Sequence, residues 1–404
     1  MSVAIALSLA LSSGIGTEAE PDTAAQLFTD NEPPAAAEPI PAPAARQPDS
    51  SKPPARVRAS ATEGFRLESA DGRFGFSLGM LGQLVFSVEQ QQPDGPAEPR
   101  FALPWARLMF QGNLWGNRVH WQVQPEFSGN TRLLDARAIV RIHPAFQILA
   151  GQYRPWLNRG FRINLPLLVL PDRGPVHDTF RVDRDIGVTV FGRPFEGRLE
   201  YYLGVMNGEG VFGQFDERNP QPLVTARVVA APLGAVSYSQ TIAAESDEDL
   251  PFRFAISANA ATNEVTQAQT TTDPTTGEVI PAPSIDVRTV HAGGDVKLQG
   301  WRLVAEGEGF WRRGETAAGV QSEAWGAYGH LSIVAVRRRL LPGLRAGVMR
   351  AEGEAAAHIP IEPGMAVFFV GNHAKLSLRY RCDLDTAGQG CLSQGGDIAA
   401  QLWF

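Results

Sequence analysis

A cluster of arginines lies between residues 154 and 184 and offers the most evident chemistry of the chain. A guanidinium group stays protonated at any physiological pH and binds oxyanions through a planar fork of N–H donors. Such a cluster either attracts small anions or pairs with neighbouring carboxylates and merely keeps its surroundings polar. Both interpretations remain open, because the arginines Arg154, Arg159, Arg162, Arg173, Arg181 and Arg184 are interspersed with Asp172, Asp178 and Asp183.

The polar residues give little support for catalysis or metal binding. The chain contains no nucleophile-elbow motif and no phosphate-cradling glycine loop ahead of a helix. His330 and His358 are isolated, and no further cysteine or close histidine pair completes a metal site. We therefore expect no enzyme activity, metal or cofactor, and keep a barrel enzyme with residues from distant strands as a minor alternative.

Cys382 and Cys391 are the only cysteines and lie nine positions apart. An oxidising compartment favours a disulfide between them, which would pin the loop that they flank. Closing so short a loop contributes about 2–3 kcal/mol at most. Two free thiols are the alternative.

Charge and composition exclude several classes of protein. The net charge is −7, and no basic face of the kind that nucleic acid requires is apparent. Hydrophobic residues make up 44% of the chain, yet no internal run of about twenty apolar residues exists, which excludes a helical membrane protein. Nearly all of the positive charge is arginine, because the only lysines are Lys52, Lys297 and Lys375.

Alternating hydrophobicity predicts the elements that position these side chains. From Trp301 to Trp311 the odd positions are apolar, whereas Arg302, Glu306 and Glu308 lie at even positions, as in a strand with one apolar and one charged face. Ten strand residues span about 33 Å, and a tilt of roughly 40° leaves about 25 Å of height. This height matches the apolar band of an outer-membrane barrel, with a tryptophan at each lipid interface.

The same alternation recurs in sixteen segments and predicts a closed antiparallel barrel. Short links at 193–197, 339–343 and 371–373 alternate with longer polar ones, as in bacterial barrels with short periplasmic turns, whereas the link at 232–251 is unexpectedly long. The segments begin near residues 73, 104, 118, 133, 145, 184, 197, 222, 252, 284, 301, 323, 343, 363, 374 and 394.

The two ends of the chain differ from this region. Residues 1–16 are typical of the apolar core of a secretory signal, although no positive charge precedes it, and a short buried strand or helix is the alternative. Residues 17–61 form an Ala/Pro-rich stretch that we interpret as a disordered periplasmic linker. The barrel domain is expected over 62–404. It ends on Phe404, a final aromatic on an alternating strand of the kind that outer-membrane barrels present to their assembly machinery.

Several motifs resemble the family of phosphate-selective porins O and P. They are residues 106–112, 151–155, 184–192, 197–210 and 372–380, which occur in order and cover most of 73–404. The resemblance implies a sixteen-stranded transmembrane β-barrel of the outer membrane, usually trimeric, whose third external loop folds inward to narrow the pore. On this alignment the third loop is residues 154–183.

On this resemblance, the arginine cluster lies at the narrowest part of the pore. The resemblance implies passive diffusion of small anions, with phosphate as one candidate, and a positive track along the wall formed by Arg107, Arg137, Arg141, Arg227, Lys375 and Arg379. The scarcity of lysine favours a general anion preference over phosphate selectivity. Glu306 and Glu308 also point inward, so anion selectivity must come from where the arginines lie and not from their number. A structural or plugged barrel without channel activity is the alternative.

Overall fold

The structure is a computed structural model that describes residues 55–60, 64–90, 95–208, 210, 221–272, 279–386 and 390–404. The expected signal segment 1–16 and most of the expected linker 17–61 lie outside these residues. In the described part of the chain, no helix is both long and apolar enough to cross a membrane.

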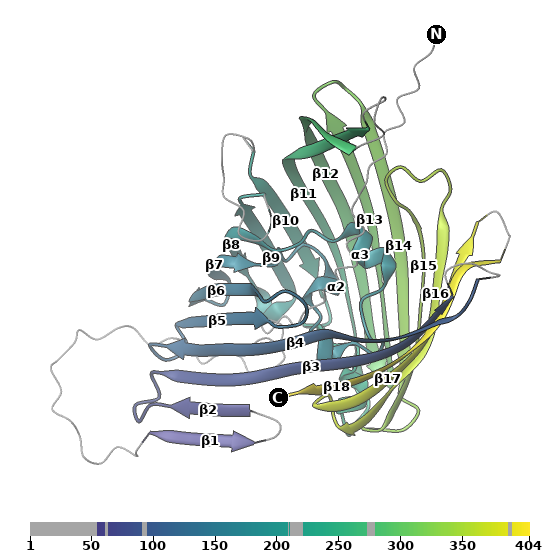
Figure 1. The fold of residues 1–404 in the computed structure, drawn as a ribbon. Helices are drawn as coiled ribbons and strands as arrows, with labels where there is room; N and C mark the ends of the chain where they lie inside the picture. The colour runs from purple at the N-terminus through teal and green to yellow at the C-terminus, as the bar shows by residue number, and fades with distance from the viewer. Residues whose placement is uncertain are drawn as a thin grey trace, which may run out of the picture.

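Sixteen antiparallel strands form a closed barrel (Figure 1), which confirms the predicted fold class. Each strand pairs with the next along the chain, and β18 closes the ring by pairing with β3, from Gln394 opposite Gln90 to Trp403 opposite Leu81. The strands are β3 (Gly75–Gln90), β4 (Glu98–Leu114), β5 (Val119–Glu126), β6 (Arg132–His143), β7 (Phe146–Tyr153), β8 (Asp185–Gly192), β9 (Leu199–Met206), β10 (Leu223–Ala230), β11 (Leu250–Thr272), β12 (Val279–Trp301), β13 (Leu303–Thr316), β14 (Gln321–Ile333), β15 (Leu340–Arg350), β16 (His358–Val370), β17 (Ala374–Asp385) and β18 (Cys391–Trp403).

An N-terminal hairpin extends the closing seam of the barrel. Its strands are β1 (Arg56–Ser60) and β2 (Gly64–Glu68), and β2 pairs with the first residues of β3, beyond the end of β18. Between the two, the backbone of Phe404 exchanges hydrogen bonds with Met80. Residues 56–60 were expected to belong to the disordered linker; that expectation is wrong, because β2 offers β1 a partner that local composition does not reveal.

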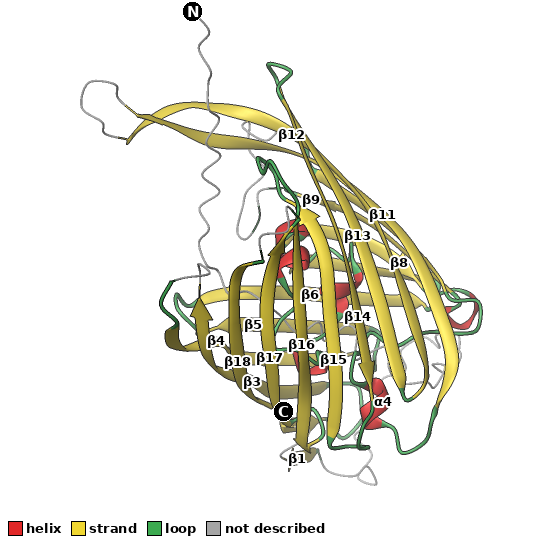
Figure 2. Ribbon diagram, turned by 90° about the vertical axis from the view of Figure 1, so that its right-hand side faces the viewer, coloured by secondary structure: helices red, strands yellow, loops and turns green. Residues whose placement is uncertain are grey.

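The connections define two rims of the barrel. We call the end that carries Phe404 the turn rim; there strands are joined by 115–118, 144–145, 193–198 with the 3₁₀ turn η2 (Phe195–Gly197), 231–249, residue 302, 334–339 and 371–373. The opposite end is the loop rim, beyond which the two longest strands, β11 and β12, extend (Figure 2).

Two predicted details at the turn rim are wrong. The link expected at 339–343 lies at 334–339, and Gly343 already pairs with Ser332 inside the sheet. Trp301 does not begin a strand but ends β12, with a φ of 53° that places it in the tight turn to β13. Turn geometry is set by the pairing of β12 with β13, which alternation of hydrophobicity does not fix.

The outer face of the wall is apolar and carries aromatic residues towards both rims. Val296 and Leu298 on β12 are exposed, whereas Lys297 between them points inward and is buried. Trp115 and Trp301 at the turn rim are 62% and 66% exposed, and Phe101 on the loop-rim half of β4 is 72% exposed. An apolar band flanked by aromatic residues is the surface that a lipid bilayer requires.

Two connections among the described residues enter the interior of the barrel. The first is 154–184, between β7 and β8, which carries α2 (Arg159–Arg162), η1 (Leu165–Leu167) and α3 (Pro175–Phe180), visible inside the ring of strands in Figure 1. Residues 152–171 are buried without interruption. The second is the turn-rim segment 231–249, with α4 (Ile242–Glu245). The predicted inward fold of the third loop is therefore confirmed.

Candidate functional site

The third loop, 154–184, is held in the lumen by apolar packing and by wall side chains that bind its backbone. Leu165, Leu167 and Leu168 pack against Leu81 and Trp105 of the wall. Lys375 on β17 donates from Nζ to the carbonyl of Pro166 at 2.8 Å and to the carbonyl of Leu168. Lys375 was predicted to line the anion path, and the structure places its ammonium on the loop backbone.

The segment 231–249 meets the third loop from the turn rim. The backbone N–H of Gln240 donates to the carbonyl of Leu167 at 3.0 Å, and its Oε1 accepts from the N–H of Val169 at 3.1 Å. Its Nε2 donates to Glu306 on β13. One glutamine therefore joins the two inserted segments to each other and to the wall.

The arginines of α2 reach carboxylates on the facing wall. Arg159 donates from Nε to Asp295 on β12 at 2.8 Å, and Arg227 on β10 approaches the other oxygen of Asp295 at 2.6 Å. Arg159 and Asp295 are 136 residues apart in the sequence, and both side chains are fully buried. The carboxylate of Asp295 therefore pairs with two guanidinium groups, one from the loop and one from the wall.

Arg162 lies in a cage of aromatic rings. Its guanidinium carbon is 4.8 Å from the ring centroid of Trp156, 4.5 Å from that of Tyr202 and 4.1 Å from that of Tyr238. Glu200 lies 3.6 Å from Arg162 and accepts hydrogen bonds from both tyrosine hydroxyls. Such cation–π contacts are strong where water is excluded.

Arg154 and Arg173 converge on Phe161 in the third loop. Arg154 donates to the carbonyl of Phe161 at 3.1 Å, and its guanidinium lies 3.8 Å from the ring centroid. Arg173 donates to the carbonyls of Gly160 and Ile163. Burial, together with Arg173 and Arg154, holds the pKa of the neighbouring His177 well below its usual range, so this ring adds no charge at neutral pH.

The remaining loop arginines lie next to acidic residues. Arg184 approaches Asp135 of the wall at 3.5 Å and Asp183 at 3.6 Å. Arg181, which is partly exposed, lies 3.6 Å from Asp178 and 3.9 Å from Asp183. The six predicted constriction arginines therefore do not form one cluster. Arg154 and Arg173 meet at Phe161, and Arg181 and Arg184 lie near Asp183. Arg159 and Arg162 reach two different wall carboxylates.

Predicted wall residues are also found on the inner face. Arg107 pairs with Glu126, and Arg137 donates to Gln122 at 2.9 and 2.6 Å. Arg141 lies half-buried near the turn-rim end of β6, on the same face as Arg137.

Arg379 on β17 belongs to a larger network with the third loop. It contacts Asp172 at 2.6 Å, Glu362 at 2.8 Å and Asp397 at 2.7 Å. Arg345 on β15 pairs with Asp172 at 2.9 Å and with Glu362 at 2.5 Å. Sequence reasoning missed Arg345 and Glu362; their inward positions follow from alternation, but their pairing depends on the register of Arg345 opposite Glu362.

Cationic side chains outnumber carboxylates inside the barrel. Among the buried residues that the structure describes, the cations are Arg107, Arg137, Arg154, Arg159, Arg162, Arg173, Arg184, Arg227, Lys297, Arg345, Lys375 and Arg379, and the carboxylates are Glu126, Asp135, Asp185, Glu200, Asp295, Glu306, Glu308, Glu362 and Asp397. The interior therefore combines close ion pairing with an excess of positive charge.

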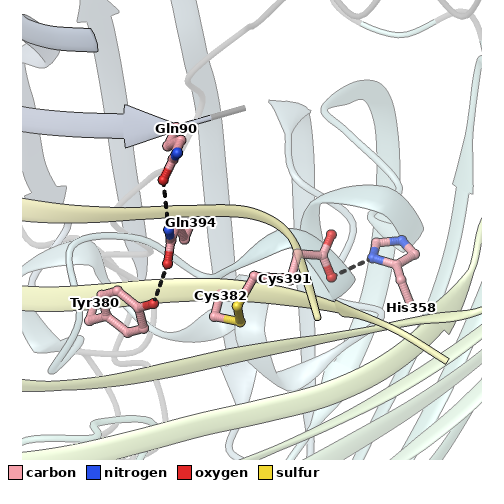
Figure 3. The surroundings of a disulfide bond; sticks show 7 residues. Gln90, His358, Tyr380, Cys382, Cys391 and Gln394 are labelled. Atoms are coloured by element: carbon pink, nitrogen blue, oxygen red, sulfur yellow. Dashed lines mark hydrogen bonds and ion pairs between the residues drawn. A yellow bond between two sulfur atoms is a disulfide. The ribbon is translucent and has the colours of Figure 1, made fainter. Parts of the chain in front are cut away.

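Cys382 and Cys391 form a disulfide at the loop rim, with 5.6 Å between their Cα atoms. Figure 3 shows it beside two side-chain contacts that tie adjacent strands: His358 to Asp383 at 2.7 Å, and Gln394 to Gln90 across the closing seam at 2.6 Å. The bond lies at the end of the β17–β18 hairpin, outside the lumen network. Within the described ranges, no three His, Cys, Asp or Glu side chains come together in a way that could hold a metal ion.

Solved structures share this architecture. OmpT of Vibrio cholerae matches with a TM-score of 0.57 at 8% identity, over 82% of this chain and 98% of its own. An anion-selective porin from Comamonas acidovorans matches with 0.53 at 8% identity, over 82% and 100%. The outer-membrane channel DcaP of Acinetobacter baumannii matches with 0.52 at 10% identity, over 82% and 97%.

The chain has the porin fold. This fold is consistent with the predicted outer-membrane location. No family model and no curated protein matches the sequence, so the resemblance to phosphate-selective porins O and P is not confirmed. At such low identity the likeness concerns the architecture of the barrel and not the roles of its lumen residues.

Proposed function

We propose that the chain is an outer-membrane channel for the passive diffusion of small anions. The observation that carries this proposal is the excess of buried cationic over buried carboxylate side chains inside the barrel. Asp295 and Glu200 each face two guanidinium groups, so these sites retain positive charge after pairing. A positive interior lowers the barrier for anions and raises it for cations.

Phosphate specificity has less support than a general anion preference. The two described lysines of the interior are both bound to the protein: Lys297 contacts Glu306 at 3.1 Å and the carbonyl of Ser239 at 2.8 Å, and Lys375 binds the third loop. We therefore propose chloride and other small inorganic anions as the solutes, with phosphate as one of them.

The reversal potential across a planar bilayer in a KCl gradient tests this proposal. We expect the sign of an anion-selective pore, and we expect Arg159→Ala to reduce the anion-to-cation permeability ratio. One charge at about 5 Å from an ion in water changes the energy of that ion by about 0.8 kcal/mol, or about fourfold in its permeability. The anion and the cation shift in opposite directions, so the ratio changes by up to about sixteenfold. Arg313→Ala, on the exposed outer face of β13, is the control and should leave it unchanged. A cation-selective sign would refute the proposal.

A plugged barrel with a structural role is the second candidate, favoured by the unbroken burial of 152–171. The same bilayers separate the two candidates. Discrete conductance steps support the channel, whereas their absence over a wide range of salt concentrations supports the plug. Block of the current by micromolar phosphate would instead assign phosphate as the specific solute.

We further propose that the barrel assembles as a homotrimer after Phe404 has been recognised by the assembly machinery. In-vitro folded OmpT of Vibrio cholerae, which matches with a TM-score of 0.56 at 12% identity, was solved in a trimer form. Chemical crosslinking of the native protein in membranes tests the proposed state, because a ladder that ends at the dimer or the monomer would contradict it.

A further inference from the structure

A cavity of about 600 Å³ lies at the turn rim, away from the buried arginines. It opens at this rim and is lined by the N-terminal hairpin, the start of the wall, the segment 231–249, the turn 371–373 and the C-terminal residues. This volume is in the range of small-molecule sites. Its apolar lining consists of Met109, Leu167, Ile242, Phe368, Trp403 and Phe404.

Asn372 supplies an oriented acceptor in this cavity. Its amide nitrogen donates to Thr241 Oγ1 at 3.0 Å and to Glu245 Oε1 at 2.6 Å. Because a carboxylate only accepts hydrogen bonds, this contact fixes the orientation of the amide. The Asn372 side chain is 6% exposed, and its carbonyl oxygen Oδ1 has no hydrogen-bond partner in the structure. A buried acceptor without a hydrogen bond costs about 1–3 kcal/mol of stability, so a ligand that donates a hydrogen bond to Oδ1 would be stabilised here.

Two further lining residues have buried polar atoms without a partner. They are Oε1 of Gln111, on the inner face of β4, and Oγ of Ser237, in the segment 231–249. The three groups therefore come from three separate elements that meet only in the folded barrel. Polar groups set among aromatic and aliphatic surfaces match a molecule with several hydroxyl groups on an apolar carbon frame.

The charges of the cavity are largely satisfied within the protein. Arg338 pairs with Asp247, and Glu245 accepts from Thr241, Ser239 and Asn372. Arg66 on β2 and Glu245 give the rest of the lining one charge of each sign. An occupant therefore gains little from a net charge of its own.

We propose that this cavity is a binding site for a neutral polyhydroxylated solute, a mono- or disaccharide. Its hydroxyl groups donate to Asn372 Oδ1 and Gln111 Oε1 and exchange a hydrogen bond with Ser237, while its C–H surface packs against the aromatic residues near the C-terminus. The site does not depend on the proposed anion selectivity, because it shares none of the buried arginines.

Isothermal titration calorimetry of the detergent-solubilised full chain with glucose and maltose tests the site, with gluconate and acetate as anionic probes. We expect saturable binding of at least one neutral sugar and a weakening of about threefold to tenfold in Asn372→Ala, the loss that one hydrogen bond produces. Gln394→Ala removes an amide at the loop rim and should bind as the wild type does.

A second variant tests the cavity independently, in case Asn372→Ala loses binding because it folds poorly. Ser77→Trp adds volume from the inner face of β3 and should abolish binding while the barrel keeps its heat-modifiable mobility on electrophoresis. Three results would overturn the proposal: no saturable heat with either sugar, binding of the anionic probes alone, or full binding by folded Ser77→Trp.

Discussion

At the scale of single residues, carboxylates shared by several arginines hold the third loop against the wall. Asp172 from the loop contacts Arg345 and Arg379 from two strands. Burial alone favours a neutral carboxyl, but Arg379 and Arg345 hold the pKa of Asp172 below its usual range. Asp172 therefore keeps its negative charge down to and below the pH at which a free aspartate protonates, about 3.9.

Asp172→Asn should make the pore more anion-selective. The substitution removes one negative charge and leaves Arg345 and Arg379 with Glu362 and Asp397. We expect the anion-to-cation permeability ratio to rise by up to about sixteenfold, by the same Coulomb estimate as for Arg159. The reversal potential measures it, and Glu323→Gln, which removes a carboxylate from the outer face of β14, is the control.

The pH dependence of the wild type provides a second check. Because the lowered pKa keeps Asp172 ionised, its contribution to selectivity should stay constant between pH 7 and about pH 4. If Asp172→Asn and the wild type became indistinguishable near pH 4, Asp172 would already have been protonated there and this assignment would be wrong.

At the scale of elements, the segment 231–249 acts as a second inserted element. The sequence already shows that this link between two strands is unusually long. The structure shows that it enters the lumen and contacts the third loop. Tyr238 reaches Glu200, and Gln240 joins Leu167, Val169 and Glu306. The position of the third loop is therefore set from the turn rim as well as by its own sequence.

Gln240→Ala should loosen the third loop. The variant loses the side-chain bonds to Val169 and Glu306, and leaving such buried groups unpaired costs about 1–3 kcal/mol. We expect lower stability to denaturant and larger or noisier single-channel currents. Gln321→Ala, an exposed glutamine at the loop-rim start of β14, should change neither. Unaltered currents and stability in Gln240→Ala would show that the loop is held without this contact.

At the scale of the whole molecule, the outward apolar face predicts how deeply the barrel sits in lipid. Val296 is exposed on the outer face of β12, opposite Gly307 on β13 and between the levels of Trp301 and Trp311. Its place near the middle of the apolar band makes it the most sensitive site for a charge.

Val296→Arg should destabilise the barrel in lipid vesicles by about 2–4 kcal/mol, the cost of a lipid-facing arginine at mid-bilayer. The matched Val320→Arg lies in the exposed loop 317–320 and should cost almost nothing. Denaturant unfolding in vesicles measures both. Equal stabilities of the two variants would place the β12 face outside the hydrocarbon region.

Alternation of hydrophobicity along the chain is enough to predict the barrel and the direction in which its side chains point. Period-two alternation is a local property, so the sixteen strands, the inward position of Glu306 and the outward position of Trp311 all follow from neighbouring residues. The resemblance to a known family then located the inward loop. Alternation misplaced the turns near Trp301 and Gly343, and local composition missed β1, because turns and edge strands depend on a partner strand.

Which charges meet and what fills the lumen follow only from the folded barrel. Arg159 and Asp295, or Asp172 and Arg379, are far apart in the chain and come together only when strand register and loop packing are fixed. The same holds for Asn372, Gln111 and Ser237 around the turn-rim cavity. The physical reason is that pairing depends on distances across the barrel, whereas sequence patterns report only which face a residue occupies.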